Sequence, residues 1–233
     1  SAGLIVKALI LAAGKGERMR PLTLNTPKPL LLAGGKPLIV HHIERLQAAG
    51  FRELVINHAW LGEQIEQTLG DGRSLGVSIE YSAEGEPLET AGGIVRALPQ
   101  LTRNSDWFAV INGDIWCDFD FRQLQPLASA KALLVLTDNP GHHPDGDFHL
   151  DDDGLVLSEG QPRLTFSGIS LLHRSLFDGL TPGSRKLAPL LREAMVAGQV
   201  QGLYHPGAWL DIGTPERLQM LNQQLASPEL PRS

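Results

Sequence analysis

Short apolar runs rich in β-branched residues alternate with segments of helical periodicity through the first half of the chain. Strands are predicted at residues 4–12, 53–57, 77–81 and 107–111, and helices between them at 38–49, 61–69 and 92–98. Parallel strands need crossover connections, and helices that make these crossovers cover both faces of a sheet. The expected fold class is therefore α/β, with a Rossmann-like, mainly parallel sheet flanked by helices.

The second half of the sequence has a different pattern. Apolar runs lie close together with turn residues between them, at 132–137, 147–150, 155–157 and 165–172. This spacing predicts an antiparallel extension or a mixed sheet. Helical spacing returns around Leu187–Met195 and at 215–225. Without an internal repeat or a linker, a single domain over residues 1–233 is expected, with a cloning remnant at 1–3 and a flexible tail at 227–233.

The charge balance and the cysteine content exclude several classes of partner. The chain has 20 basic and 26 acidic residues and a net charge of −6, so a broad basic surface for nucleic acid or an anionic membrane is not expected. The apolar run at 4–13 is too short to span a bilayer. Cys117 has no second cysteine to pair with, which favours a reducing, cytoplasmic location. No protein partner can be inferred.

A glycine-rich segment with several cations follows the first predicted strand. It reads Ala12-Ala13-Gly14-Lys15-Gly16, continues with Arg18, and later places Lys28 between two prolines. Glycines let backbone N–H groups approach a phosphate, and the prolines restrict the backbone of Lys28. Neither the dinucleotide fingerprint nor the P-loop pattern is present, since Met19 stands where the fingerprint needs a small residue. For the glycines alone a solvated turn is the alternative, but the added cations favour a phosphate site.

Four motifs in a fixed order carry a resemblance to one family. They are the segment 11–30, the segment 84–93 with the sequence EGEPLETAGG, the triplet Asn112-Gly113-Asp114, and the segment 209–214 with the sequence WLDIGT. Together they resemble the sugar-1-phosphate nucleotidyltransferases. The resemblance implies the nucleotide-diphospho-sugar transferase fold and nucleotide-sugar biosynthesis. The resemblance also implies the chemistry of this family, which is the Mg²⁺-dependent transfer of a nucleotidyl group from a nucleoside triphosphate to a sugar 1-phosphate, with release of pyrophosphate.

Two further segments indicate which members of this family the chain resembles most. Residues 57–62 and 138–143 are most similar to short family members that join UMP from UTP to N-acetylmuramate 1-phosphate in peptidoglycan recycling. Transfer to mannose 1-phosphate from GTP, or to glucose 1-phosphate from dTTP or UTP, stays an alternative. A non-catalytic sensor of nucleotide sugars is an alternative of another class. The identity of the sugar cannot be derived from residues in this sequence.

The resemblance also implies roles for individual residues. The expected catalytic residues are Arg18, Lys28, Asp114 and Asp211, of which the two aspartates are also the expected Mg²⁺ ligands. The expected nucleotide-binding residues are Ala12, Ala13, Gly14, Lys15, Gly16, Glu84 and Gly92, and the expected substrate-binding residues are Asn112 and Glu159. Asp114 also follows a predicted strand, at the edge where open α/β sheets bind ligands. Carboxylate oxygens suit Mg²⁺, although an Asx turn is the alternative for either aspartate alone.

The cations and Glu84 receive more specific expectations from the same resemblance. Lys15 and Arg18 are expected at the β- and γ-phosphates, and Lys28 at the point where the two substrates' phosphates meet. Glu84 is expected to accept an N–H of uracil, thymine or guanine. Glu159 corresponds to a glutamate that contacts a sugar hydroxyl in relatives, which often continue with Lys-Pro, whereas this chain continues with Gly-Gln-Pro.

Two groups of histidines are expected to lie outside the site. One loop carries His142, His143, Asp145 and Asp147, whose spacing matches no zinc motif and whose proline and glycine neighbours predict a solvated loop. His41 and His42 are adjacent on a predicted helix, so they cannot face one site together and are expected at surface or boundary positions.

Overall fold

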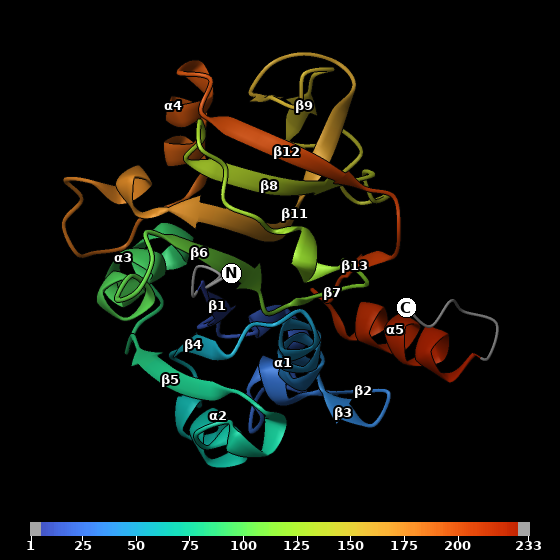
Figure 1. Ribbon diagram of the computed structural model, residues 1–233. Coiled ribbons are helices and arrows are strands. Elements are labelled where there is room, and N and C mark those ends of the chain that lie inside the picture. The colour runs from blue at the N-terminus through green and yellow to red at the C-terminus, as the bar shows by residue number, and fades with distance from the viewer. Residues whose placement is uncertain (1–5, 228–233) are drawn as a thin grey trace.

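A nine-stranded mixed sheet forms the centre of the computed structural model, which describes residues 6–227 (Figure 1). Its parallel part has the order β6-β1-β4-β5 and consists of β1 (Lys7–Ala12), β4 (Glu53–His58), β5 (Ser78–Ala83) and β6 (Trp107–Asn112). The helices that connect these strands are α1 (Leu38–Ala48), α2 (Gly62–Leu69) and α3 (Glu89–Leu101). The predicted α/β class is confirmed. The expected remnant at 1–3 and all but the first residue of the expected tail at 227–233 lie outside the described residues.

The antiparallel extension is also present. The long strand β11 (Arg163–His173) pairs antiparallel with β6 and with β8 (Ala132–Thr137). Two short strands, β9 (Phe148–Leu150) and β10 (Val156–Leu157), continue the sheet beyond the first residues of β11. The outer strand β12 (Val200–His205) runs parallel to β8, and it follows the helix α4 (Ala188–Val196). The sheet is therefore mixed, as the spacing of the apolar runs predicts.

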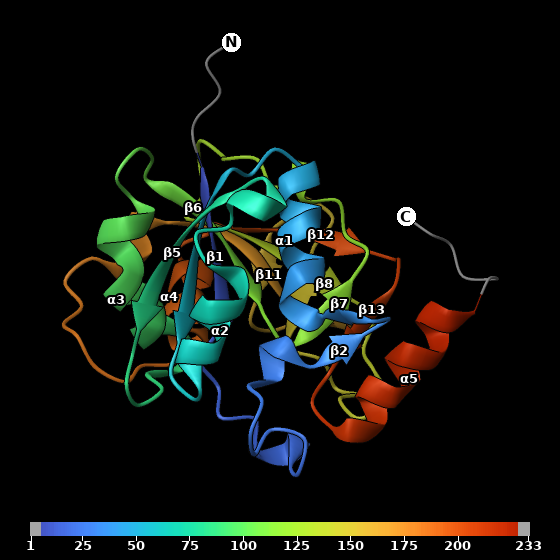
Figure 2. The same ribbon diagram turned by 90° about the horizontal axis from the view of Figure 1, so that it is seen from below.

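Helices cover both faces of the sheet (Figure 2). On one face, α1 contributes Ile39, Ile43 and Leu46, which are fully buried and lie on one side of the helix because they are three or four residues apart. On the other face, α3 and α4 pack against a second set of strand side chains that includes Phe108 and Val110. Alternate residues of each strand thus belong to different cores, and both cores are apolar.

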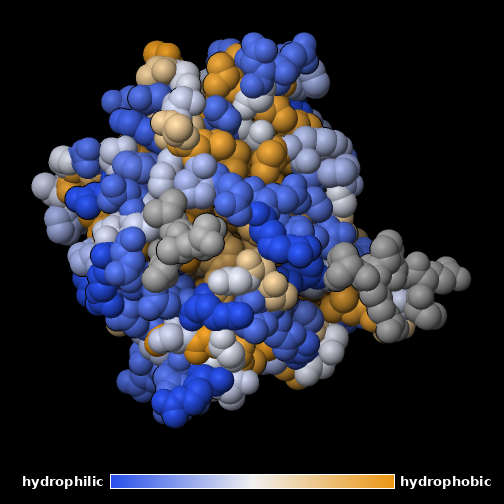
Figure 3. Space-filling view, in the orientation of Figure 1, coloured by the Kyte–Doolittle hydropathy of each residue, from blue (hydrophilic) through white to orange (hydrophobic). Residues whose placement is uncertain are grey.

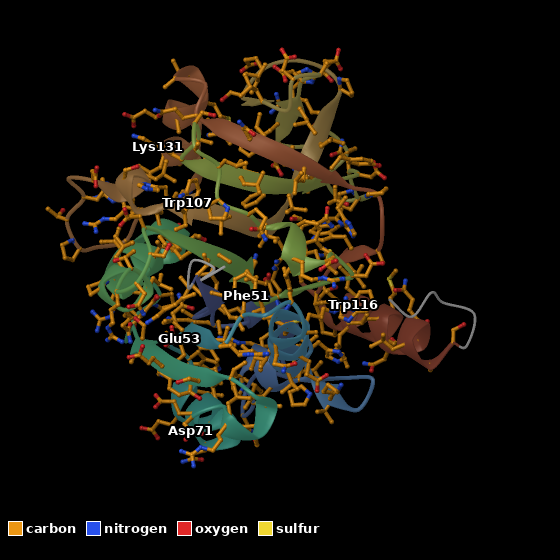
Figure 4. The ribbon with its side chains drawn as sticks, viewed as in Figure 1. Phe51, Glu53, Asp71, Trp107, Trp116 and Lys131 are labelled. Carbon is orange, nitrogen blue, oxygen red and sulfur yellow. The ribbon has the colours of Figure 1, made fainter. Side chains whose placement is uncertain are left out.

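A third, smaller core connects the loop after β1 to the end of the described chain. It contains Met19, Leu38 and Ile212, together with Leu218 and Leu221 of the last helix α5 (Pro215–Ala226). Two small antiparallel ladders lie beside it, β2 (Leu32–Ala33) with β3 (Lys36–Pro37), and β7 (Ile115–Cys117) with β13 (Trp209–Asp211). Trp116 of β7 lies toward α5 (Figure 4) and stacks with the guanidinium of Arg45, 5.0 Å from the ring centre. Burial of Met19 anchors the glycine-rich loop.

The outer surface is mostly polar on the face drawn in Figure 3, and apolar residues gather there over the region of β8 and β12. Among residues 6–227, none of the helices is both long enough and apolar enough to cross a membrane.

His42 corrects the expectation that both adjacent histidines lie at the surface. Its side chain points into the protein from α1 and is only 4% exposed, whereas His41 is partly exposed and contacts the backbone oxygen of Ala33 at 2.7 Å. Burial lowers the pKa of His42 to about 4, and the backbone polar groups of Gly113 and Ile115 oppose this shift only partly. His42 is therefore neutral in the folded protein near pH 7.

The buried imidazole of His42 should make the protein less stable in acid. The unfolded chain takes up this proton near the ordinary histidine pKa of 6.5, but the folded protein does so only near 4. The free energy of unfolding should therefore fall by about 3 kcal/mol as the pH drops from 7 to 4, and this contribution should be constant below pH 4. Urea unfolding of the wild type and His42→Gln at several pH values isolates the effect. Parallel pH profiles of the two proteins would contradict it.

Candidate functional site

Two cavities meet at the carboxyl edge of the parallel strands. The first has a volume of about 550 Å³ and is lined by the glycine-rich loop and the segment that follows β5. The second, of about 780 Å³, lies over β11 and is bounded by α4 and the loop before β9. The residues that line both cavities are Leu11, Arg18, Glu89, Thr90, Asn112 and Asp114. Two ligands bound in these cavities would meet at this shared wall.

The glycine-rich loop is folded back on itself and leaves one glycine open to the first cavity. Gly16 has a positive φ of 65°, and a Cβ there would lie 2.9 Å from Cγ2 of Thr23. The Thr23 hydroxyl donates a hydrogen bond to the Gly16 carbonyl at 2.6 Å, which closes the loop. A Cβ on Gly14, in contrast, would have no atom within 4 Å, and this glycine lines the cavity. Its backbone is accessible to a ligand.

Lys28, which lines the first cavity, forms an ion pair with Asp114 of the shared wall. The Lys28 ammonium lies 3.1 Å from Oδ2 of Asp114, and its side chain is only 12% exposed. Pro29, directly after Lys28, is buried in the structure, so the short turn that carries the lysine is fixed. The expected ammonium is therefore held at the shared wall. Lys15 lies farther out, 44% exposed and 3.3 Å from a carboxylate oxygen of Glu86 across the mouth of the first cavity.

Asp211 is placed next to Asp114 by the β7–β13 ladder. Asp211 pairs with Ile115, and the N–H of Ile212 donates to the carbonyl of Asp114 at 2.8 Å. Asp211 lines the second cavity, where its Oδ2 lies 2.9 Å from Arg217. A Cβ on Gly213 would lie 2.7 Å from Arg217, 2.9 Å from Asp211 and 3.0 Å from Arg18, so this glycine leaves room for all three side chains.

The two aspartates fit a hard divalent cation. They supply carboxylate oxygens from adjacent backbone positions, and both line the cavity that borders the glycine-rich loop. Asp114 contacts Lys28 through Oδ2, and Asp211 contacts Arg217 and His142 through Oδ2. Oxygen donors of this kind favour Mg²⁺ over softer metals. They are the residues that could hold the predicted metal ion.

A chain of hydrogen bonds forms the wall of the first cavity behind the glycine-rich loop. The N–H of Ala12 donates to Oδ1 of Asn57 at 2.7 Å, and Nδ2 of Asn57 donates to Oε2 of Glu84 at 2.8 Å. The other oxygen of Glu84 accepts the N–H of Leu88 at 3.0 Å. Burial raises the pKa of Glu84, and these two hydrogen bonds oppose the shift. A Cβ on Gly93 would lie 2.6 Å from Glu84, so Gly93 is required by this network.

The network predicts that Glu84→Gln destabilises the protein. An amide can accept only through its oxygen, so its NH₂ group would face either the Asn57 amide or the Leu88 N–H, and two donors would oppose each other. A loss of about 1–3 kcal/mol in the free energy of unfolding is expected. Adding Asn57→Asp should restore the loss, because a carboxylate at position 57 can accept from both the Ala12 N–H and the new amide.

Glu84→Gln and the double variant Glu84→Gln/Asn57→Asp also test whether Glu84 recognises the base of a nucleotide. If it does, discrimination among UTP, dTTP, GTP and CTP should be altered in both the single and the double variant, although only the single variant is unstable. Unchanged ratios of kcat/KM in the stable double variant would remove Glu84 from base recognition. Urea unfolding and steady-state kinetics give the two readouts.

Two expected ligand-binding residues lie outside the cavities. Gly92 is buried in α3 and packs against another loop, where a Cβ would lie 2.4 Å from the Gly183 carbonyl. It therefore makes room for protein and does not line the first cavity. Glu159 is exposed on the turn between β10 and β11 and lines neither cavity. Pairing of Arg163 with His149 places this turn at the outer edge of the sheet. The remaining expected residues line at least one cavity: Ala12, Ala13, Gly14, Lys15, Gly16, Arg18, Lys28, Glu84, Asn112, Asp114 and Asp211.

The loop before β9 is largely exposed, as expected, but it also borders the second cavity. His142, His143 and Asp147 line the second cavity, and His142 lies 3.4 Å from Oδ2 of Asp211. His143 contacts Oδ1 of Asp147 at 2.9 Å, and Oδ2 of the same aspartate accepts the N–H of Phe166. In the sequence, only the cluster of histidines and aspartates pointed to this loop as a candidate site. Its position depends on the pairing of β9 with β11, which periodicity does not reveal.

A nucleotidyl transferase family model matches residues 7–148 of this chain, which include the glycine-rich loop, Glu84 and Asp114. The chain belongs to the nucleotidyl transferase family. The N-acetylmuramate alpha-1-phosphate uridylyltransferase of Neisseria meningitidis serogroup B is 54% identical over 222 residues, which cover 91% of this chain and 95% of that protein. The mannose-1-phosphate guanylyltransferase catalytic subunit beta of Drosophila melanogaster is 33% identical over 90% of this transferase, which spans 60% of that subunit's length.

Solved structures share the fold of this transferase. A putative glucose-1-phosphate thymidylyltransferase from Bacillus anthracis, in complex with a sucrose, superposes with a TM-score of 0.82 and 22% identity, covering 97% of this chain and 98% of that one. The protein HddC from Yersinia pseudotuberculosis, complexed with GMP-PN, gives a TM-score of 0.76 at 20% identity and covers 94% of this chain and 98% of that one. The nucleotidyltransferase architecture is thus preserved at low sequence identity.

Proposed function

We propose that this transferase moves UMP from UTP to N-acetylmuramate 1-phosphate and releases pyrophosphate. The observation that carries the proposal is the pair of cavities that share Arg18, Asn112 and Asp114. The 54% identity to a uridylyltransferase for this sugar phosphate, over nearly the full length of both chains, supports the choice of substrates. UTP would occupy the first cavity and the sugar phosphate the second.

The reaction joins two anionic groups, and the charges at the shared wall address their repulsion. An oxygen of the sugar phosphate attacks the α-phosphorus of UTP, the bond to the β-phosphate breaks, and pyrophosphate leaves from the opposite side. Lys28, which is nearly buried beside Asp114, is positioned to neutralise the meeting phosphates. When bound at Asp114 and Asp211, Mg²⁺ supplies further positive charge to the phosphate oxygens. The attacking phosphate is already ionised, so no general base is required.

The loop around the first cavity would hold the triphosphate. The open backbone at Gly14 can approach a phosphate, and Arg18 lines both cavities. Lys15 can exchange its contact with Glu86 for the outer phosphates. The proposed roles follow from these positions. Cytoplasmic location and participation in peptidoglycan recycling stay predictions.

A matrix of nucleotides and sugar phosphates tests the proposal. UTP, dTTP and GTP are each combined with the 1-phosphates of N-acetylmuramate, N-acetylglucosamine, glucose and mannose, and pyrophosphate release is measured with Mg²⁺. The highest kcat/KM is expected for UTP with N-acetylmuramate 1-phosphate. Preference for GTP with mannose 1-phosphate would instead favour a guanylyltransferase, and binding without turnover of any pair would indicate a nucleotide-sugar sensor.

A further inference from the structure

The second cavity has cationic side chains that the nucleotide cavity does not share. Lys186 and Arg192 line it on the side of α4, whereas Arg18 lines both cavities. Within the described part of the chain, neither Lys186 nor Arg192 has an acidic side chain at ion-pair distance. Two positively charged residues therefore line this part of the wall without an ion-pair partner among the described residues.

Four acidic residues line the same cavity, and each has a partner among the described residues. Glu89, which also lines the first cavity, accepts a hydrogen bond from the Ser184 hydroxyl at 3.4 Å. Asp114 pairs with Lys28, and Asp211 pairs with Arg217. Asp147 accepts hydrogen bonds at both of its carboxylate oxygens. On the α4 side, Lys186 and Arg192 line the cavity without an ion-pair partner, whereas the carboxylates of the cavity all have partners, so this side would favour an anionic group of a ligand.

The first turn of α4 adds to this preference. Leu187 and Ala188, at the start of the helix, line the cavity. Leu187 provides no side-chain hydrogen bond to the first N–H groups, and the first turn contains no acidic residue. The positive end of the helix is therefore not neutralised by an internal cap.

An independent feature of the same cavity is a buried hydroxyl without a partner. Ser170 lies on β11, is only 1% exposed and lines the cavity together with Leu187 and Leu191. Its Oγ makes no hydrogen bond to any described residue. A buried hydroxyl in this state is unfavourable, and a polar group of a ligand would satisfy it.

We infer that the α4 side of the second cavity is a subsite for a carboxylate on the sugar, held by Lys186 and Arg192. The inference rests on the proposed function, because N-acetylmuramate carries a carboxylate on a lactyl ether that N-acetylglucosamine lacks. The phosphate of the sugar would lie at the shared wall near Arg18 and Asp114, which leaves the second anion for the cations that line only this cavity. The subsite makes the enzyme selective for acidic sugars.

Removing the two charges should affect one sugar and not the other. In Lys186→Gln/Arg192→Gln, kcat/KM for N-acetylmuramate 1-phosphate should fall about 10-fold, mainly through a higher KM, since the side chains are exposed and remote from the shared wall. The value for N-acetylglucosamine 1-phosphate, measured with the same UTP concentration, should be unchanged. Lys131→Gln is the matched control, because Lys131 (Figure 4) carries the same charge and lines neither cavity.

Calorimetric binding of both sugar phosphates to the wild type and the double variant separates this inference from the proposed function. Selective loss of N-acetylmuramate 1-phosphate binding supports the carboxylate subsite. An equal loss for both sugar phosphates would overturn it in favour of phosphate binding by Lys186 and Arg192, and no loss for either would remove them from the subsite. If the wild type binds the carboxylate sugar selectively but transfers no UMP to it, the proposed function fails and the subsite stands.

Discussion

Replacing Asp114 or Asp211 with asparagine is expected to lower kcat by about 10²–10³, because each change removes a charged oxygen from the wall where the two substrates' phosphates meet. Asparagine has the same shape, and the carboxylates lie in a solvent-accessible cavity, so the free energy of unfolding should change by about 1 kcal/mol or less. Steady-state kinetics and urea unfolding of both variants measure the two effects.

Asp118→Asn is the matched control for the aspartate variants. Asp118 lies near the same ladder and contacts His205 at 2.6 Å, but it lines neither cavity. Its loss should lower stability and leave kcat unchanged. Full turnover of Asp114→Asn or Asp211→Asn, or of the wild type in excess chelator, would show that these carboxylates do not hold a metal ion that the reaction requires.

Lys28→Met is expected to lower kcat by about 10²–10³, with a smaller effect on the KM for UTP. The ammonium is 12% exposed and next to Asp114, so its charge acts where negative charge is concentrated in the transition state. Lys15 is more exposed and lies at the cavity mouth, so Lys15→Met should mainly raise the KM for UTP, by about 3–10-fold. Kinetics with both substrates varied distinguish these effects.

Lys36→Met controls for loss of a lysine charge, since Lys36 pairs with Glu44 on the surface and lines neither cavity. If Lys28→Met changed only the KM for UTP while Lys15→Met abolished kcat, the two assignments would be reversed. If neither variant changed the kinetics, the glycine-rich loop would not bind the phosphates.

The fold was predictable where the local pattern of apolar residues is sufficient to specify a strand or a helix. Runs such as the one that became β1 are apolar on both sides because both faces of a parallel strand are covered, and the spacing of Ile39, Ile43 and Leu46 specifies a helix. β12 was not predicted, since Gly202 and the polar residues around it weaken the strand pattern. Its pairing with β8 depends on a long-range contact that the local sequence does not contain.

The candidate site was predictable to the extent that the motifs lie at the ends of strands. The glycine-rich loop and Asp114 follow β1 and β6, so the topology brings them together at one edge. The positions of Glu159 and the histidine loop depend on which strands pair at the far side of the sheet. The local sequence therefore could not show that the loop borders the second cavity or that Glu159 lines neither cavity. The role of Gly93 beside Glu84 required the packing of α3 to be known.

The configuration of the α-phosphorus after transfer tests direct attack between the substrates. The two cavities share a wall, so the sugar phosphate should attack UTP in a single in-line step, without transfer of UMP to a protein side chain. A single diastereomer of UTP in which sulfur replaces one non-bridging oxygen of the α-phosphate should then give a UDP-sugar of inverted configuration at that phosphorus, determined by phosphorus NMR. Retention of configuration would indicate two displacements and a covalent intermediate, and would contradict direct transfer between the cavities.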